Sequence, residues 1–196
     1  RDLLFSIIGR IEIKLRSKLN YTITKFTNNP YWYLDGDLFL DDEEHEHLEL
    51  LKKIKNDFKK SEEEFAQYFK DNYKNNFKTI YQHDFSELPP FWIVSETMMF
   101  GDMKNIYESL KKNQFTSKPK NELDKLANEF GAINLAELNT WLIYIKLIRN
   151  RCAHHSRVWN AHYFSVANIT QTKFNRLTIA PKNPNRIYSF FVILNI

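Results

Sequence analysis

The chain of 196 residues contains a single cysteine, only four glycines and no apolar run long enough to cross a bilayer, which takes about 18 residues. One cysteine cannot form an internal disulfide, so the sequence predicts a protein of the reducing cytoplasm. The scarcity of glycine, without a phosphate-cradling loop, argues against nucleoside triphosphate hydrolysis. No signal peptide is recognisable either, so no membrane partner is expected.

Metal-binding patterns are also scarce. The chain has no His-Glu-x-x-His segment, and His45 and His47 are the only spaced histidine pair outside residues 149–160. Their acidic surroundings predict a solvent-exposed helix and not a metal site. Cys152 lies close to two histidines, but its small neighbour Ala153 predicts a packed position, and no acyl-transfer motif accompanies it. The sequence therefore predicts neither a metal nor another cofactor.

Acidic residues are missing from the last third of the chain. Residues 138–196 contain no aspartate or glutamate but eight lysines and arginines, Lys146 among them. Such a distribution is typical of a protein that binds a polyanion. Residues 35–64 are the opposite, with twelve carboxylates against five lysines. This pattern is typical of a solvated helix face, although it also suits contact with a basic partner.

Helical periodicity dominates the sequence. Apolar residues at three- and four-residue steps predict helices at about 2–26, 41–58, 62–78, 89–101, 102–110, 122–130, 138–148 and 186–195. Short extended pieces are predicted only at 166–170 and 177–180. We therefore predict an all-α fold in which the hydrophobic residues, 43% of the chain, form one core.

The predicted domain organisation is a single domain at 1–196 with an acidic helical insertion at about 35–85. Because the chain begins inside an amphipathic pattern and stops after an apolar run, both ends are expected to be truncated. Within the insertion, four aromatic residues at helical spacing are expected to be buried in the core. They are Phe65, Tyr68, Phe69 and Tyr73.

The segment at 149–160 carries the densest chemistry in the chain. It reads Arg149-Asn-Arg-Cys-Ala-His-His-Ser-Arg-Val-Trp-Asn160, with three arginines and two adjacent histidines in twelve residues. It follows the helix predicted at 138–148, whose last carbonyls favour nearby cations. Arg149 and His154 are five residues apart, which is about 140° around a regular helix. For the two to converge, the helix must bend or end between them, or a substrate must bridge them.

An arginine and a histidine are sufficient for metal-independent cleavage of RNA. Arginine can hold a phosphate by a two-point fork and stabilise its charged transition state, while histidine transfers protons near neutral pH. The simpler interpretation is structural. In that case a histidine caps helix carbonyls, the arginines pair with carboxylates and Trp159 packs as a loop anchor.

Three blocks of the sequence together resemble a known family. Arg149-Asn-x-x-x-His154 matches the R-x4-6-H signature of HEPN (higher eukaryotes and prokaryotes nucleotide-binding) ribonucleases, and the longer string to Asn160 is similar to that of Abi-like abortive-infection proteins of the AbiD/AbiF type. The second block is Leu88-Pro-Pro-Phe-Trp-Ile-Val-Ser-Glu-Thr-Met-Met-Phe-Gly101, which has one residue more than expected between proline and tryptophan. The third is Ile11-Glu-Ile-Lys-Leu-Arg16. The resemblance implies a HEPN-like helical bundle.

The resemblance also implies roles for individual residues. Arg149 and His154 are expected to be the catalytic pair and Asn150 their polar accessory residue, while an R-x5-H alignment would give the catalytic role to His155. A second set is expected to bind RNA phosphates, namely Arg151, Arg157 and Lys146. A third set is expected to support the structure, namely Trp159, Asn160, Glu12 and Arg16. Glu12 and Arg16 are also one turn apart, so an exposed pair is the alternative for them.

Glu96 is expected to support the site. It follows Trp92 by four residues and therefore shares its helix face, which we predict to point inward. A buried carboxylate needs a partner, and the resemblance offers Arg149 or a histidine.

The function that the resemblance implies is a metal-independent endoribonuclease of an antiphage abortive-infection or toxin–antitoxin system. Because such enzymes commonly combine two motifs and this chain contains one, a homodimer is expected, and control by an antitoxin protein or small RNA would suit it. The alternative is a noncatalytic RNA-binding module that holds a regulatory RNA. A purely structural helical protein is the third possibility.

Overall fold

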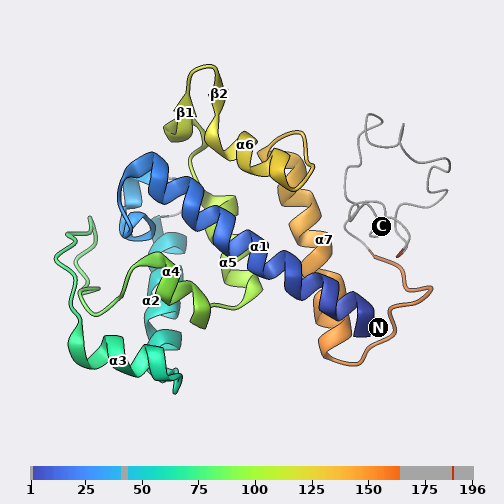
Figure 1. Cartoon of the computed structure of the whole chain (residues 1–196), viewed down its shortest axis with the longest axis horizontal. Coiled ribbons are helices and arrows are strands. Elements are labelled where there is room, and N and C mark those ends of the chain that lie inside the picture. Colours follow the sequence, from blue (N-terminus) through green and yellow to red (C-terminus); the bar gives the residue numbers. More distant parts are fainter. Residues whose placement is uncertain (1, 41–43, 164–186, 188–196) are drawn as a thin grey trace. The chain divides into compact units, whose positions relative to one another are not determined.

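The computed structural model describes residues 2–40, 44–163 and 187, and over these ranges the chain is predominantly helical (Figure 1). This confirms the predicted all-α fold. The α-helices are α1 (Asp2–Thr27), α2 (Glu44–Lys60), α3 (Glu64–Asn72), α4 (Phe91–Val94), α5 (Phe100–Ser109), α6 (Glu122–Glu129) and α7 (Leu135–Ala153). Short 3-10 turns lie at Trp32–Leu34, Gly36–Leu38, Ser95–Thr97 and Lys112–Phe115. Strands β1 (Thr116–Ser117) and β2 (Lys120–Asn121) form one antiparallel hairpin.

The chain divides into two compact units. One comprises residues 1–13 and 124–196, and the other comprises residues 14–123. The insertion predicted at about 35–85 lies within the second unit, which begins before residue 35 and ends after residue 85. Among the described residues, no helix is long and apolar enough to cross a membrane.

Helix α1 confirms the long amphipathic helix predicted at 2–26. Its apolar positions at three- and four-residue steps are buried, as periodicity predicts. These residues are Leu4, Ile8, Leu15, Leu19 and Ile23. Leu3, which the same pattern includes, is instead 69% exposed. The helix ends at Thr27, and Asn28 follows with a φ of 51°, a left-handed conformation that asparagine tolerates.

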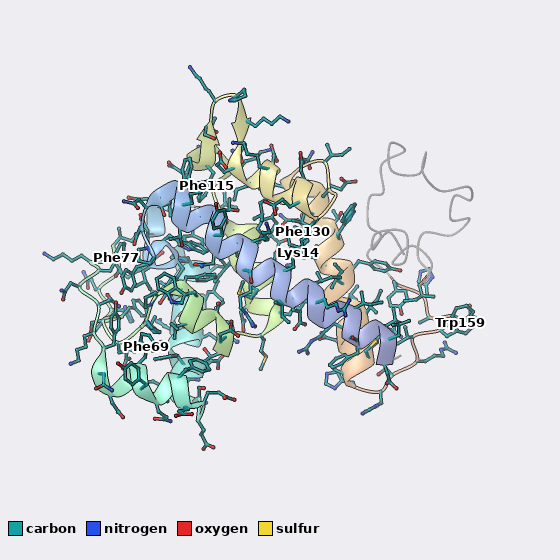
Figure 2. The ribbon with its side chains drawn as sticks, viewed as in Figure 1. Lys14, Phe69, Phe77, Phe115, Phe130 and Trp159 are labelled. Atoms are coloured by element: carbon teal, nitrogen blue, oxygen red, sulfur yellow. The ribbon has the colours of Figure 1, made fainter. Side chains whose placement is uncertain are left out.

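Aromatic side chains form the core of the 14–123 unit. The rings of Trp32 and Phe91 lie 4.4 Å apart, and the fully buried Tyr33 donates its hydroxyl to the Pro89 carbonyl at 2.7 Å. Phe115, labelled in Figure 2, packs against Phe26 with 5.5 Å between ring centroids. The hydrogen bond leaves the Tyr33 hydroxyl satisfied although it is away from water.

The helices predicted at 89–101 and 102–110 have different boundaries in the structure. The first breaks at Met98, whose backbone is extended, and α5 begins at Phe100. Gly101 therefore lies inside the first turn of α5 and does not end a helix. Asp102 is the third residue of α5, and its carboxylate accepts a hydrogen bond from the Met99 N–H at 3.3 Å. The helix predicted at 102–110, with Asp102 as its capping residue, therefore begins earlier, because Met99 is the N-cap and Asp102 lies one turn into the helix.

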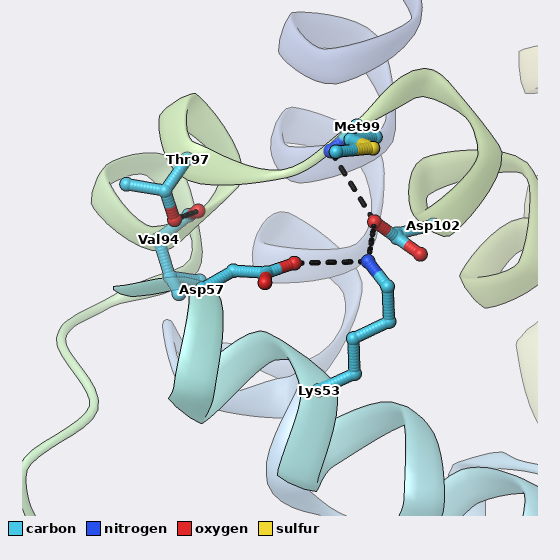
Figure 3. A network of polar contacts seen from close by, with 6 residues as sticks. All are labelled: Lys53, Asp57, Val94, Thr97, Met99 and Asp102. Carbon is cyan, nitrogen blue, oxygen red and sulfur yellow. Dashed lines mark hydrogen bonds and ion pairs between the residues drawn. The ribbon is translucent and has the colours of Figure 1, made fainter. Parts of the chain in front are cut away.

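Asp102 also joins α5 to α2 through a lysine. The Lys53 ammonium donates to Asp102 at 2.6 Å and to Asp57 at 2.9 Å (Figure 3). Partial burial of Lys53 opposes its charge, but these two carboxylates outweigh that effect and raise the lysine pKa. The Asp102 side chain is 9% exposed and that of Lys53 is 44% exposed, so solvent is excluded only from the carboxylate side of this ion pair.

The helix predicted at 62–78 is shorter in the structure, and its aromatic residues are less buried than expected. Helix α3 ends at Asn72, so Tyr73 lies beyond it, and Tyr68 is 64% exposed. Tyr68 therefore does not belong to the core. Phe69 contacts both of these tyrosines edge-on, with ring centroids 5.7 and 5.5 Å away. The aromatic residues form a partly solvated cluster instead of a buried one.

His47 also differs from its prediction. It was expected on a solvated helix face, yet it is 4% exposed and stacks on Phe39 at 3.8 Å. Its Nε2 lies 3.0 Å from the Tyr33 carbonyl, and its Nδ1 lies 2.6 Å from the Tyr81 hydroxyl. Because a carbonyl only accepts, we assign the proton of neutral His47 to Nε2. Burial lowers the pKa of His47 to about 4.

Some predictions fall outside the described residues. They concern the helix start at Asp41 and the extended pieces at 166–170 and 177–180. Most of the helix predicted at 186–195 is likewise outside, although Ile187 itself is helical and buried.

Candidate functional site

Helix α7 places the 149–160 segment at its carboxyl end. The helix begins with an N-cap, in which the Asn134 side chain accepts from the Glu137 N–H at 3.0 Å. The Glu137 carboxylate in turn accepts from the Ile133 N–H. The apolar face predicted at 138–148 is buried in full. It comprises Leu138, Trp141, Leu142, Ile145 and Ile148.

The helix ends in a turn that favours glycine but contains histidine. The Ser156 N–H donates to the Arg151 carbonyl at 2.9 Å, and the His155 N–H donates to the Cys152 carbonyl at 3.2 Å. These two hydrogen bonds define a Schellman motif with His154 as the C-cap and His155 as the next residue. His155 accordingly has a φ of 53°, a left-handed conformation that is strained for residues with a side chain. Both histidines are exposed.

We expect His155→Gly to raise the free energy of unfolding by about 1 kcal/mol, because glycine adopts this conformation without strain. Urea denaturation monitored by circular dichroism would measure the change. His154→Gly is the matched control, since His154 has a φ of −88° and gains nothing from glycine. A loss of stability in His155→Gly would mean that the histidine side chain makes stabilising contacts.

Arg149 is oriented by a carboxylate from α1. Its Nε donates to the Glu12 Oε1 at 3.2 Å, and both side chains are partly buried, with 33% and 24% exposed. This contact uses only the Nε edge of the guanidinium, so the two terminal nitrogens have no hydrogen-bond partner among the described residues. A guanidinium held in this way can offer both terminal nitrogens to a phosphate.

Helix α7 also carries Asn150 and His154 of the predicted catalytic set and Lys146 of the predicted RNA-binding set. Asn150 is exposed, and Lys146, one turn before it, is partly exposed. The helix stays regular through Ala153, so Arg149 and His154 remain about 140° apart around its axis. The helix ends only at its C-cap, His154, whose N–H still donates to the Asn150 carbonyl at 2.9 Å, so the Cα–Cβ bonds of this pair leave the helix in different directions.

Arg151 stabilises the turn that follows α7. Its Nη1 donates to the Arg157 carbonyl at 3.0 Å, and its guanidinium carbon lies 5.1 Å from the centre of the Tyr163 ring. The Tyr163 hydroxyl donates to the Val158 carbonyl at 3.1 Å. These contacts give Arg151 a structural position, whereas the Arg157 side chain is exposed.

The residues that attach this turn to the core are Val158, Ala161 and Tyr163, which are all buried. Trp159 does not have the packing role predicted for it, because it is 78% exposed. Trp159 and Asn160 are the central residues of a turn, in which the Ala161 N–H donates to the Val158 carbonyl at 3.4 Å, so Trp159 lies at the tip of the turn while Val158 is buried. Asn160 has a φ of 52°, which suits asparagine at a chain reversal.

Glu96 has a different partner from those predicted. Its side chain is 51% exposed and accepts from the Arg16 Nη1 at 2.8 Å. Glu96 therefore neither points inward nor pairs with Arg149. Glu12 and Arg16, although one turn apart on α1, each bind a residue far along the chain. Sequence spacing alone suggested only their mutual pair.

Other chemistries find little support in the part of the chain that the structure describes. No group of three or more His, Cys, Asp or Glu side chains there is arranged to hold a metal ion. Cys152 is buried at 4% exposure, as its small neighbour predicted. A nucleophilic thiol needs access to its substrate, which this position does not provide.

Comparison with known proteins identifies the family. A family model described as Abi-like protein matches residues 1–160. The match includes all three sequence blocks that suggested the resemblance, from α1 through the end of the 149–160 segment. No curated protein and no solved structure matches the chain. Because the family model covers most of its length, the chain belongs to the family of Abi-like proteins.

Proposed function

We propose that this Abi-like protein is a metal-independent endoribonuclease of the HEPN type that acts in abortive infection or in a toxin–antitoxin system. The observation that carries the proposal is the geometry of Arg149. Glu12 holds its Nε, its terminal nitrogens have no partner among the described residues, and two exposed histidines follow within six residues. The family match supports a role in abortive infection.

The reaction needs one base, one acid and a stabiliser of negative charge. A histidine removes the proton from a ribose 2′-hydroxyl, and the resulting oxygen attacks the adjacent phosphorus. The bond from phosphorus to the 5′-oxygen breaks, and that oxygen receives a proton. The products are a 2′,3′-cyclic phosphate and a 5′-hydroxyl. Arg149 stabilises the charge that develops on the phosphate oxygens, and Asn150 contributes a further hydrogen bond.

The strained backbone of His155 is relevant to which of the two histidines transfers the proton. A left-handed residue other than glycine at a helix end costs stability, so a histidine in this conformation favours a role for the side chain. His154 occupies the unstrained C-cap and matches the R-x4-H spacing. We propose His154 as the proton-transferring residue and His155 as its supporting neighbour, and the variants described below separate the two.

The angle between Arg149 and His154 supports a site assembled from two copies. Because the Cα–Cβ bonds of the two residues leave the helix about 140° apart within one chain, a homodimer would let the arginine of one copy act with the histidine of the other. We further propose a cytoplasmic protein held in check by an antitoxin, either a protein or a small RNA on the basic surface.

The test is RNA cleavage in EDTA. Purified protein is incubated with total RNA and with a labelled single-stranded RNA, beside His154→Ala, His155→Gly and Arg149→Ala. His83→Ala is the control, because His83 is an exposed histidine in the other compact unit. We expect cleavage by the wild type and the control, and a loss of at least about 100-fold in His154→Ala. Since His155→Gly should be more stable than the wild type, any loss of cleavage in it cannot come from unfolding.

The divergence of Arg149 and His154 within one chain also favours a second candidate, a noncatalytic module that holds RNA. That function predicts binding without cleavage, with an affinity that falls on substitution of arginines and with rising salt. A purely structural role for the Arg149–Glu12 pair predicts a third result. In that case Arg149→Ala would lower stability, and no RNA would bind.

A further inference from the structure

Trp159 lies beside a recess that the proposed cleavage reaction does not use. The recess has a volume of about 430 Å³, which is within the range of small-ligand pockets. Leu3, Leu4, Val158 and Ile187 give it an apolar lining, and Trp159 and Arg157 also border it. All of these residues belong to the same compact unit as α7.

The exposed indole is held on a well-fixed backbone. Arg151 binds the carbonyl of Arg157, and the Tyr163 hydroxyl binds the carbonyl of Val158, so hydrogen bonds fix the residues immediately before Trp159. Figure 2 shows the Trp159 side chain extending outward from this stretch. It is 78% exposed and has no ring partner among the described residues. An aromatic ring exposed in this way loses little freedom when a ligand stacks on it.

The chemistry around the ring favours an anionic aromatic ligand. The Arg157 side chain is exposed, and its guanidinium makes no ion pair or hydrogen bond with the described residues. None of the described residues that border the recess is a carboxylate, and the sequence from 138 to 196 contains none at all. A flat π-surface next to an available guanidinium is the arrangement with which proteins bind unpaired nucleotides, since the base stacks and the phosphate pairs.

From this geometry we infer that the recess is a subsite for one unpaired RNA base, which stacks on Trp159 while Arg157 binds the adjoining phosphate. The inference rests on the proposed function in that the same RNA would present its neighbouring phosphodiester to the 149–155 segment. The subsite therefore favours single-stranded RNA, because a paired base is not free to leave its stack.

The experiment measures binding with a strand that cannot be cut. The probe is a fluorescein-labelled single-stranded RNA with 2′-O-methyl riboses, since cleavage requires a free 2′-hydroxyl, and an abasic strand of equal length is the comparison. We expect Trp159→Ala to weaken binding of the probe about 10- to 100-fold and to leave binding of the abasic strand unchanged. Trp159→Phe should retain most of the affinity. Arg157→Gln should weaken both strands and reduce the salt dependence of binding.

Trp92→Ala is the matched control. Trp92 is the other exposed tryptophan, at 45%, and it lies in the 14–123 unit, so its loss should leave both affinities unchanged. Equal affinity of wild type and Trp159→Ala for the base-bearing strand would overturn the inference, as would failure of the wild type to bind that strand. A shift in the monomer–dimer equilibrium of Trp159→Ala without a change in RNA affinity would also overturn it, and would assign the recess to a second copy.

Failure of the inference is distinguishable from failure of the proposed function. If the wild type binds the probe through Trp159 but cleaves no RNA, the base subsite is supported and the proposed ribonuclease activity is refuted. If the protein cleaves RNA at the same rate with and without Trp159, the ribonuclease activity is supported and the base subsite is refuted.

Discussion

Arg149→Lys is expected to reduce the rate of RNA cleavage by about 100- to 1000-fold while the protein stays folded. Arg149 donates its Nε to Glu12 and has two further nitrogens available for the phosphate. Lysine has one nitrogen at the end of a flexible chain, so it cannot bind the carboxylate and grip two phosphate oxygens at the same time. Single-turnover cleavage of labelled RNA measures the loss without interference from product release.

Two further variants test this explanation. Arg10→Lys is the matched control, because Arg10 is exposed on α1 in the same compact unit and has no part in the proposed site. Glu12→Gln keeps an oxygen that can accept from the Arg149 Nε but removes the charge, and we expect its rate of RNA cleavage to fall about 10-fold. Cleavage by Arg149→Lys within a few-fold of the wild type would show that the guanidinium fork has no special role in the transition state.

Acid is expected to destabilise the 14–123 unit through a single histidine. Burial lowers the pKa of His47 from 6.5 to about 4, so the folded protein keeps this ring neutral over a range in which the unfolded chain binds a proton. The stability that neutral His47 contributes is therefore complete above about pH 6.5 and is lost as the pH falls toward 4. The loss from this residue amounts to about 3 kcal/mol.

Urea denaturation at a series of pH values between 7 and about 4 measures this effect. The control is His47→Gln, in which the side-chain amide can still donate to the Tyr33 carbonyl but does not titrate. We expect this variant to be less stable than the wild type at neutral pH and to show a flatter pH dependence. Parallel pH profiles for the two proteins would contradict a neutral, buried His47.

Periodicity predicted the helices whose apolar faces are longest. Helices α1, α2 and α7 were all predicted, because a wide apolar stripe is a local property of the sequence. The helix predicted at 138–148 was too short, since α7 continues to Ala153 and includes the start of the 149–160 segment. The helix boundaries within residues 89–110 were harder to predict. Its helical pattern continues across Met98, where the backbone is extended, and the capping by Asp102 that starts α5 depends on one side-chain hydrogen bond.

The chemistry of the candidate site was also visible in the sequence, because its residues are neighbours along one helix end. The arginines, histidines and missing carboxylates of the last third, with the three family blocks, were sufficient to identify an Abi-like protein. Sequence could not assign the partners of these residues. Arg149 binds Glu12 from 137 positions away, and Glu96 binds Arg16 from 80 positions away.

Burial of single side chains was likewise decided by tertiary packing. His47 lies in an acidic, hydrophilic stretch, yet Phe39 and Tyr33, which are outside its helix, enclose it. Trp159 has a side chain typical of a core, yet Val158 and Tyr163 occupy the buried positions of its turn. Local sequence determines which backbone conformations and chemical groups are present, since these depend on near neighbours. Which groups meet, and which remain exposed to solvent, depends on contacts between distant segments that form only when the chain folds.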